Sequence, residues 1–165
     1  MKHLTLIRHA KSSWKEEGLS DFDRPLNKRG KNDLPLLCER LLQAKITPDF
    51  LLYSSSLRTT LTAEMIIKRL NLPQAICHPC ADIYESSPAT LLHVIQQTPA
   101  EAEHLMLVGH NPGLQELGKL LLGQSLPHFP TSAVLHLTCP VESWQELEEQ
   151  RARLVWFDYP KLHLR

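Results

Sequence analysis

The chain carries no excess charge of either sign. Its 165 residues include 18 lysine and arginine and 18 aspartate and glutamate side chains, so the formal net charge at pH 7 is zero. Proteins that bind nucleic acid through their overall charge are strongly basic, and this composition argues against a nucleic-acid partner. Any site for an anion must therefore be local.

Long hydrophobic runs are also absent. No uninterrupted stretch approaches the roughly 20 apolar residues of a membrane span. The N-terminus lacks the apolar run behind a basic cluster that marks a signal peptide. We therefore expect a cytoplasmic protein without membrane association. Repeats, low-complexity tracts and linkers are missing too, so residues 1–165 are expected to form a single domain.

Cysteine is scarce, and its spacing does not favour a metal or redox site. Cys77 and Cys80 are close in sequence, while Cys38 and Cys139 are isolated. A zinc site usually needs a second ligand pair at suitable spacing. If the CHPC segment is a strand, side chains three positions apart point to opposite faces and cannot chelate one ion. We expect reduced thiols, no metal ligands and no cofactor.

Apolar segments of strand length alternate with segments of helical period. This alternation predicts an α/β fold, a three-layer sandwich whose mostly parallel central sheet is covered by helices on both faces. The last two strands are joined without a clear helix, which allows an antiparallel edge. The expected strands are 3–9, 49–54, 74–80, 104–110, 131–137 and 153–159, and the expected helices are 27–44, 56–70, 87–97 and 111–122.

Two helices carry specific expectations. Pro35 lies inside the first helix, whose regular part is expected to begin near Pro35 or to bend there. In the second helix, apolar residues recur at helical spacing and are expected to face the core. These residues are Leu57, Leu61, Met65 and Ile66.

Basic residues and histidines follow three of the expected strands. The first strand ends on Arg8 and His9, Arg58 opens the helix after the second strand, and the most apolar strand ends on His110. The carboxyl ends of parallel strands meet at one edge of a sheet, where ligands bind in α/β proteins. Guanidinium groups match phosphate oxygens, and helix N-termini add N–H donors. The convergence predicts a site for a tetrahedral dianion.

A neutral imidazole beside such a dianion is a competent nucleophile. The unperturbed pKa of histidine is about 6.5, and neighbouring arginines favour the neutral form further. Phosphoryl transfer asks mainly for positioning and charge stabilisation, which the other groups supply. The residues therefore indicate, though not uniquely, a phosphatase that works through a phosphohistidine intermediate.

Several motifs between residue 1 and about residue 137 carry a family resemblance. The segments RHAKSSW, DFDRPLNKRG, SSSLRTTLTAE, YESSP, LVGHNPGL and FPTSAVLHL occur in this order. Together they resemble the histidine phosphatase superfamily, with its phosphoglycerate-mutase-like fold, and within it the SixA branch of phosphohistidine phosphatases. The resemblance implies that His9 is the nucleophile that becomes phosphorylated. It also implies that Arg8, Arg58 and His110 form the phosphate pocket and that Arg24 lines it.

The chain departs from the wider superfamily in two ways. The first motif usually ends in glycine, whereas Ala10 stands here, and a methyl group is tolerated where φ is negative. Larger mutase-like members carry an insertion with an acidic proton donor, for which this chain has no room. Glu85 of YESSP is the best remaining candidate acid. A P–N bond breaks readily once its nitrogen is protonated, so a missing donor agrees with phosphohistidine as the substrate.

The substrate and even turnover stay open at this stage. The phosphorylated partner is a histidine-containing phosphotransfer domain, a phosphocarrier or a small phosphorylated molecule. One alternative is a small-molecule phosphomonoesterase of the same superfamily, which would depend on Glu85. Another is a non-catalytic module that binds a phospho-ligand. A metallo-hydrolase is less favoured, because no His/Asp pair has ligand spacing.

Other polar and aromatic residues have ordinary interpretations. Trp14 is expected to pack or to form the pocket rim, and Thr131 and Ser132 either donate to the pocket or start a strand. The remaining histidines without an arginine partner at a strand end are expected on the surface or at the edge of the core. These include His3, His93, His104, His128, His136 and His163.

Overall fold

One six-stranded sheet runs through the chain, and a computed structural model describes residues 1–164. Over these residues no helix is long and apolar enough to cross a membrane. The strands are β1 (Lys2–Arg8), β2 (Phe50–Ser54), β3 (Cys77–Cys80), β4 (His104–Gly109), β5 (Val134–Cys139) and β6 (Arg153–Asp158). The α-helices are α1 (Lys28–Gln43), α2 (Leu57–Arg69), α3 (Pro88–Gln96) and α4 (Gly113–Leu122).

The sheet is mostly parallel, as the sequence predicts. Its strand order is β3-β2-β4-β1-β5-β6, and the first four strands in this order pair in parallel. β5 is antiparallel to both β1 and β6, so the antiparallel strand lies inside the sheet and not at its edge. No α-helix separates β5 from β6, and strands joined without a crossover helix pair in antiparallel fashion.

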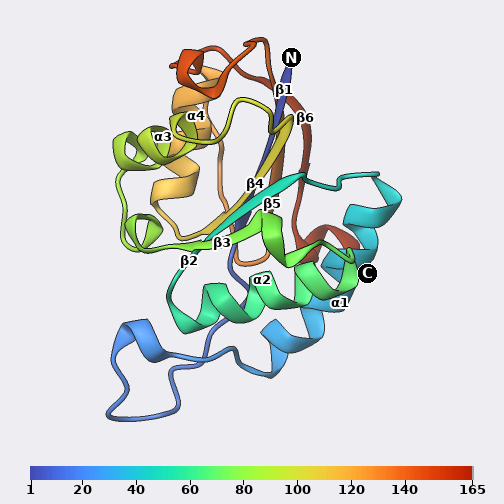
Figure 1. Ribbon diagram of the computed structural model, residues 1–165. Helices are drawn as coiled ribbons and strands as arrows, with labels where there is room; N and C mark the ends of the chain where they lie inside the picture. Colours follow the sequence, from blue (N-terminus) through green and yellow to red (C-terminus); the bar gives the residue numbers. More distant parts are fainter. Residues whose placement is uncertain (165) are drawn as a thin grey trace.

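Helices cover both faces, which confirms the three-layer arrangement (Figure 1). Along β1, Leu4 and Leu6 point into a core that includes residues of α3 and α4. Ile7 points to the other face and packs in a second core with residues of α1 and α2. Strands that are buried on both faces read as nearly continuous apolar runs, which explains why β1 and β4 stand out in the sequence.

The first helix begins before Pro35, near which one of the two expectations placed its start. α1 starts at Lys28, and the side chain of its N-cap residue Asn27 accepts a hydrogen bond from the Gly30 N–H at 2.8 Å. The expectation of a start near Pro35 is therefore wrong, since Pro35 lies well inside the helix. A side-chain cap satisfies a donor of the first turn, and this stabilises a start upstream of the proline.

The second helix turns a partly polar face toward the sheet. Its buried residues include Thr59, Thr62 and Ile66, whereas Leu57 is 37% exposed. Thr62 is buried because its hydroxyl oxygen accepts from the Ala10 N–H at 3.0 Å. The expected apolar register is therefore correct for Ile66 and wrong for Leu57.

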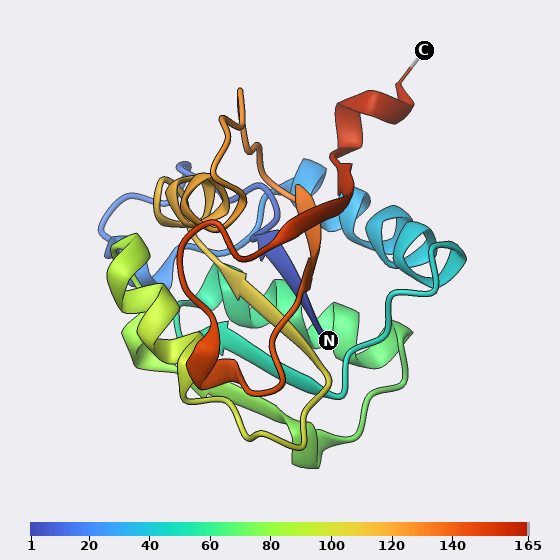
Figure 2. The same ribbon diagram turned by 90° about the horizontal axis from the view of Figure 1, so that it is seen from above.

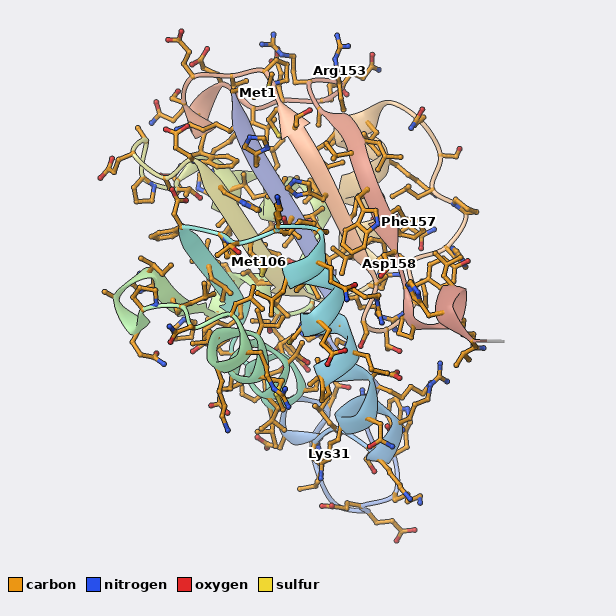
Figure 3. The ribbon with its side chains drawn as sticks, turned by 90° about the vertical axis from the view of Figure 1, so that its right-hand side faces the viewer. Met1, Lys31, Met106, Arg153, Phe157 and Asp158 are labelled. Carbon is orange, nitrogen blue, oxygen red and sulfur yellow. The ribbon has the colours of Figure 1, made fainter. Side chains whose placement is uncertain are left out.

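The C-terminal segment is tied to α1 through Asp158. The buried Asp158 carboxylate accepts from Arg40 Nε at 2.6 Å and from His163 Nε2 at 2.6 Å. Figure 3 shows β6 running from Arg153 to Asp158, after which the chain turns beside α1. These contacts fix the position of the turn Pro160–His163 next to the end of the sheet.

Candidate active site

The ends of three parallel strands bring the predicted site residues together. β4 pairs with β1 on one side, with Arg8 opposite Gly109, and with β2 on the other. The rings of His9 and His110, which follow β1 and β4, lie with their centroids 5.3 Å apart. Both line a cavity of about 650 Å³. All the residues predicted for the site line it: Arg8, His9, Arg24, Arg58, Glu85 and His110.

His9 is buried, and its hydrogen bonds define which ring nitrogen is free. Its Nδ1 lies 2.7 Å from the carbonyl oxygen of Ala10. A carbonyl only accepts, so Nδ1 carries the proton and Nε2 keeps its lone pair, to which Arg58 Nε donates at 3.4 Å. Burial is the largest cause that lowers the pKa of His9, to about 3, and neighbouring positive charge adds to it. The imidazole is therefore neutral at pH 7 and available as a nucleophile.

The Arg58 guanidinium lies between the two imidazole rings. Its Nη2 is 3.4 Å from Nδ1 of His110. A guanidinium only donates, so this Nδ1 accepts, and the Nε2–H of His110 donates to Ser54 Oγ at 2.8 Å. Burial first and the charge of Arg58 second lower the pKa of His110 to about 4. Both rings are neutral at pH 7, and the positive charge of the pocket comes from its arginines.

Arg8 reaches from the end of β1 to the loop after α4. Its Nη1 donates to the carbonyl oxygen of Phe129 at 3.0 Å. Its buried Nε has no hydrogen-bond partner among the described residues. Burial and the neighbouring Arg58 lower the pKa of Arg8. A buried donor without a partner is costly, and an incoming anion would supply the acceptor that Arg8 lacks.

Asp21 is a pocket residue that the sequence analysis missed. Its Oδ2 accepts from Arg58 Nη2 at 3.0 Å and from the Tyr84 hydroxyl at 2.5 Å, and its Oδ1 accepts from Arg24 Nε at 3.1 Å. Burial opposes its ionisation, but these hydrogen bonds outweigh that effect and lower the pKa of Asp21 to about 2. The carboxylate is ionised at pH 7 and holds the two arginines in place.

The sequence does contain a signal for Asp21 and Tyr84. Asp21 lies in the motif DFDRPL beside Arg24, and Tyr84 lies in the motif YESSP beside Glu85. The hydrogen bond between Asp21 and Tyr84 joins residues 63 positions apart, and no local spacing predicts it.

Arg24 is buried in the pocket wall and is not an ordinary surface arginine. Its Nη1 donates to Ser12 Oγ at 2.8 Å, and its guanidinium stacks on Trp14, with Cζ 3.4 Å from the ring centroid. The Trp14 side chain is 76% exposed, which places it on the rim as expected. Arg24 is therefore held rigidly, in part by Asp21 and in part by the loop that precedes it.

Two exposed carboxylates stand on the rim of the cavity. Glu85, with φ at 50°, follows Tyr84, and Glu116 lies in the first turn of α4. Among residues 1–164, neither side chain makes a hydrogen bond or ion pair shorter than 4.0 Å with a pocket side chain. Glu116 is a further candidate acid that the sequence analysis did not name. Its place is set by α4, which starts at Gly113, three residues after His110.

The backbone around His9 accommodates alanine in place of the usual glycine. The described residues with positive φ do not include Ala10, so its methyl group meets no backbone strain. Ser132 has φ at 61°, and its N–H lies 3.1 Å from the carbonyl oxygens of both Arg8 and His9. β5 begins only at Val134, so Ser132 belongs to the turn behind the pocket, while Thr131 lines the cavity.

The remaining histidines and the cysteines lie apart from this cavity. His3, His104 and His136 form a cluster at the amino-terminal end of β1, with ring centroids 5.1 to 5.9 Å apart. All four cysteines are free thiols. Within residues 1–164, no group of three or more His, Cys, Asp or Glu side chains is arranged to hold a metal ion.

Comparisons with known proteins agree with this fold and site. A family model described as the histidine phosphatase superfamily (branch 1) matches residues 4–86. An uncharacterised chloroplastic protein of Arabidopsis thaliana is 30% identical over 154 residues, which cover 88% of this chain and 70% of that protein. An Agrobacterium tumefaciens protein assigned as the phosphohistidine phosphatase SixA has a crystal structure that matches with a TM-score of 0.82. It is 28% identical, with 96% of this chain and 98% of that chain covered.

A structure of the protein histidine phosphatase SixA complexed with tungstate shows the same fold. Its TM-score is 0.78 at 22% identity, over 94% of this chain and 95% of that one. The chain therefore belongs to the histidine phosphatase superfamily, with the phosphoglycerate-mutase-like α/β fold. Within that superfamily it is a SixA-type member. It is accordingly an enzyme with phosphatase activity, which acts on phosphorylated substrates.

Proposed function

We propose that this protein removes the phosphoryl group from phosphohistidine through a covalent phosphohistidine intermediate on His9. The observation that carries the proposal is the state of the His9 ring. Its Nδ1–H is committed to the Ala10 carbonyl, and its Nε2 lone pair faces the arginines of the cavity. A neutral nucleophile beside charged donors is the arrangement that phosphoryl transfer requires.

The proposed reaction has two displacements at phosphorus. The substrate phosphoimidazole is protonated on its other ring nitrogen. His9 Nε2 attacks the phosphorus, a new P–N bond forms, and the P–N bond of the substrate breaks to release a neutral imidazole that keeps this proton. Water then attacks the phosphorus of phospho-His9, which releases inorganic phosphate and restores the free Nε2. Arg8 and Arg58 would hold the equatorial oxygens, and their charge and N–H groups would stabilise the transition state. His110 would join them once the phosphoryl group replaces the Arg58 contact at its Nδ1 and the ring proton moves from Nε2 to Nδ1, with the Ser54 hydroxyl then donating to Nε2.

The acid–base groups of the pocket favour a leaving group that carries its own proton. Asp21 has a pKa of about 2, so it cannot donate a proton at neutral pH. Glu85 and Glu116 are exposed on the rim. A phosphorylated imidazole can take a proton on its nitrogen and leave readily, whereas an alkoxide needs a positioned acid. This supports a phosphoramidate over a phosphate ester as the substrate.

Two further candidates are distinguished by the same experiment. A small-molecule phosphomonoesterase would need Glu85 or Glu116 as its acid, and both do line the cavity. A non-catalytic module that binds a phospho-ligand would use the arginines alone and has no need for a free Nε2 on His9.

The test is timed incubation with a phosphohistidine peptide and, separately, with p-nitrophenyl phosphate, both with a chelator present. We expect faster turnover of the peptide and acid-labile, base-stable phosphate on the enzyme. His9→Ala should lower the rate by at least about 10³-fold, because it removes the nucleophile. The matched control is His93→Ala, an exposed histidine on α3, which should match the wild type.

Each opposing result points to one alternative. Normal activity of His9→Ala would end the covalent mechanism. Fast hydrolysis of the ester alone, lost in Glu85→Gln or Glu116→Gln, would make the protein a phosphomonoesterase. Vanadate binding without turnover of either substrate would leave a binding module. Loss of activity on chelation would contradict the metal-independent reaction.

A further inference from the structure

A second hollow adjoins the catalytic cavity on the Arg8 side. It has a volume of about 280 Å³ and shares Arg8, Lys11 and Thr131 with the catalytic cavity. It continues between the start of α1 and the C-terminal turn, and we call it the basic groove. Its basic side chains are Arg8, Lys11, Arg29, His128 and Lys161.

The basic groove carries positive charge without an opposing carboxylate. The catalytic cavity is lined by Asp21, Glu85 and Glu116 beside its cations. Among the residues that the structure describes, no aspartate or glutamate lines the groove. Arg29 has a partner on its own helix, but only at 3.7 Å and with 47% of the Arg29 side chain exposed, and such a pair contributes little. In a chain with no net charge, this local excess of cations marks a site for an anion.

The walls of the groove are held in place by contacts on three sides. Arg8 donates to the Phe129 carbonyl, and the His128 ring stands edge-on to Tyr159 at 4.6 Å. Behind them Asp158 ties the C-terminal turn to α1. Figure 2 shows the loop after α4 and the C-terminal turn projecting on the same side of the molecule. A preformed cleft loses less side-chain conformational entropy when it binds an anion than scattered surface lysines would.

The loop between β1 and α1 offers exposed apolar side chains. Trp14, which lines the catalytic cavity, is 76% exposed, and Leu19 and Phe22 on the same loop are 41% and 38% exposed. Exposed aromatic and aliphatic side chains beside a site favour contact with a protein surface over contact with a small polar metabolite. The catalytic cavity is therefore bordered by apolar surface at Trp14 as well as by the basic groove.

We propose that the basic groove binds a carboxylate side chain of a phosphoprotein substrate, adjacent to the phosphohistidine whose phosphoryl group enters the catalytic cavity. This inference rests on the proposed function and names its substrate class: a phosphohistidine flanked by acidic residues. Arg8 lines both hollows, so the two anions bind as neighbours on one substrate. The groove adds charge complementarity, which governs partner choice and the rate of encounter more than the chemical step.

The test compares two synthetic phosphohistidine peptides that differ only in flanking residues, aspartate and glutamate in one and asparagine and glutamine in the other. The wild type and the double variant Arg29→Gln/Lys161→Gln are assayed, with Lys68→Glu on the exposed face of α2 as the control matched in net charge change. Fructose 1,6-bisphosphate and fructose 6-phosphate form a second pair of substrates. Thermal melting of each variant verifies that it is folded.

We expect the wild type and Lys68→Glu to favour the acidic peptide by about tenfold in kcat/KM at low salt, as two to three exposed charge pairs would give. The preference should decline with ionic strength. The double variant should lose it and turn over the neutral peptide at the wild-type rate.

Other outcomes overturn the inference in distinguishable ways. Equal turnover of the two peptides by the wild type, or a preference that survives in the double variant, would reject the groove as the carboxylate site. A preference for the bisphosphate over the monophosphate that the double variant loses would assign the groove to a second phosphate of a small molecule. No turnover of either peptide would overturn the proposed function on which this inference rests.

Discussion

At the scale of single residues, the pocket is organised by one carboxylate that belongs to none of the strand ends. Asp21 reaches in from the loop between β1 and α1 and accepts from Arg58, Arg24 and Tyr84. In the proposed reaction it would have two opposing effects on an incoming phosphoryl group. It fixes the direction of the Arg58 guanidinium, which aids the transition state, and its negative charge competes with the substrate for the same donors.

Asp21→Asn should separate these two effects. The amide keeps a similar shape but loses the charge. Its NH₂ group is itself a donor, so it cannot accept the hydrogen bond that a carboxylate oxygen accepted at the same position. We expect kcat to fall about tenfold, the scale of a lost charged hydrogen bond, while vanadate binds more tightly. Steady-state kinetics with vanadate inhibition measures both. The control is Asp23→Asn in the same turn, whose carboxylate accepts from Ser20 and not from the pocket. Unchanged kcat and unchanged vanadate affinity in Asp21→Asn would contradict this role.

The convergence of the proposed catalytic residues in one cavity could be predicted from sequence because they lie at or next to strand ends. Arg8, His9 and His110 follow apolar strands directly, and parallel pairing places such ends together. Asp21 and Tyr84 could not be predicted in this way, since they reach the pocket from loops through long-range contacts. Local spacing carries no information on how a loop folds back over a sheet edge.

At the scale of elements, the start of α4 is pressed against the loop that bears Tyr84 and Glu85. A Cβ on Gly113 would lie 2.5 Å from the carbonyl oxygen of Ser86. Both Gly113 and Ser86 line the catalytic cavity. The absence of a side chain on Gly113 therefore sets the width of one wall of the site.

Gly113→Ala should push these two elements apart. We expect the free energy of unfolding to fall by about 1–3 kcal/mol, the usual cost of overpacking, and kcat/KM to fall with it. Chemical denaturation and kinetics on the same preparation measure the two effects. As a control, Ala89→Gly removes one methyl group from an exposed residue in the first turn of α3, whereas Gly113→Ala adds one. Wild-type kinetics in a stably folded Gly113→Ala would contradict the close approach.

Element boundaries were harder to predict than element types. The alternation of strands and helices is correct because apolar runs bury in a sheet covered on both faces. The start of α1 depends on the Asn27 cap more than on Pro35, and the inner face of α2 depends on the hydrogen bond from Ala10 to Thr62. Both are specific polar contacts, which a pattern of apolar residues does not predict.

At the scale of the whole molecule, histidines occupy both ends of the sheet. At the end away from the catalytic cavity, Thr5 Oγ1 lies 2.7 Å from His104 Nε2 and 2.8 Å from His136 Nδ1. Burial is the main cause that lowers the pKa of each of these histidines to about 4. A hydroxyl has one proton, so it donates to one ring and accepts from the other, and both rings are held in their neutral forms.

This cluster should make stability depend on pH. In the unfolded chain the histidines titrate near 6.5, so as pH falls below that value the unfolded state binds protons that the folded state excludes. The free energy of unfolding should therefore fall between about pH 6.5 and pH 4 and level off, for these groups, below their folded pKa of about 4. His136→Gln should make this slope shallower by up to about 1.4 kcal/mol per pH unit. Urea unfolding at pH 7, 6 and 5 measures it.

The comparison needs an exposed histidine outside the cluster. His93→Ala on the exposed face of α3 provides that reference and should keep the wild-type slope. A His136→Gln variant whose slope equals that of the wild type would contradict the assignment of the acid sensitivity to the cluster.

The length of β1 has a consequence for how acid acts on this enzyme. Thr5, which contacts His104 and His136, lies four residues before His9, a separation of about 13 Å at about 3.3 Å per residue. The two histidine groups therefore touch different neighbours, Thr5 at one and Arg58 at the other. His136→Gln can accordingly remove one contribution to acid unfolding while it leaves the protonation of His9, and with it acid inactivation, in place.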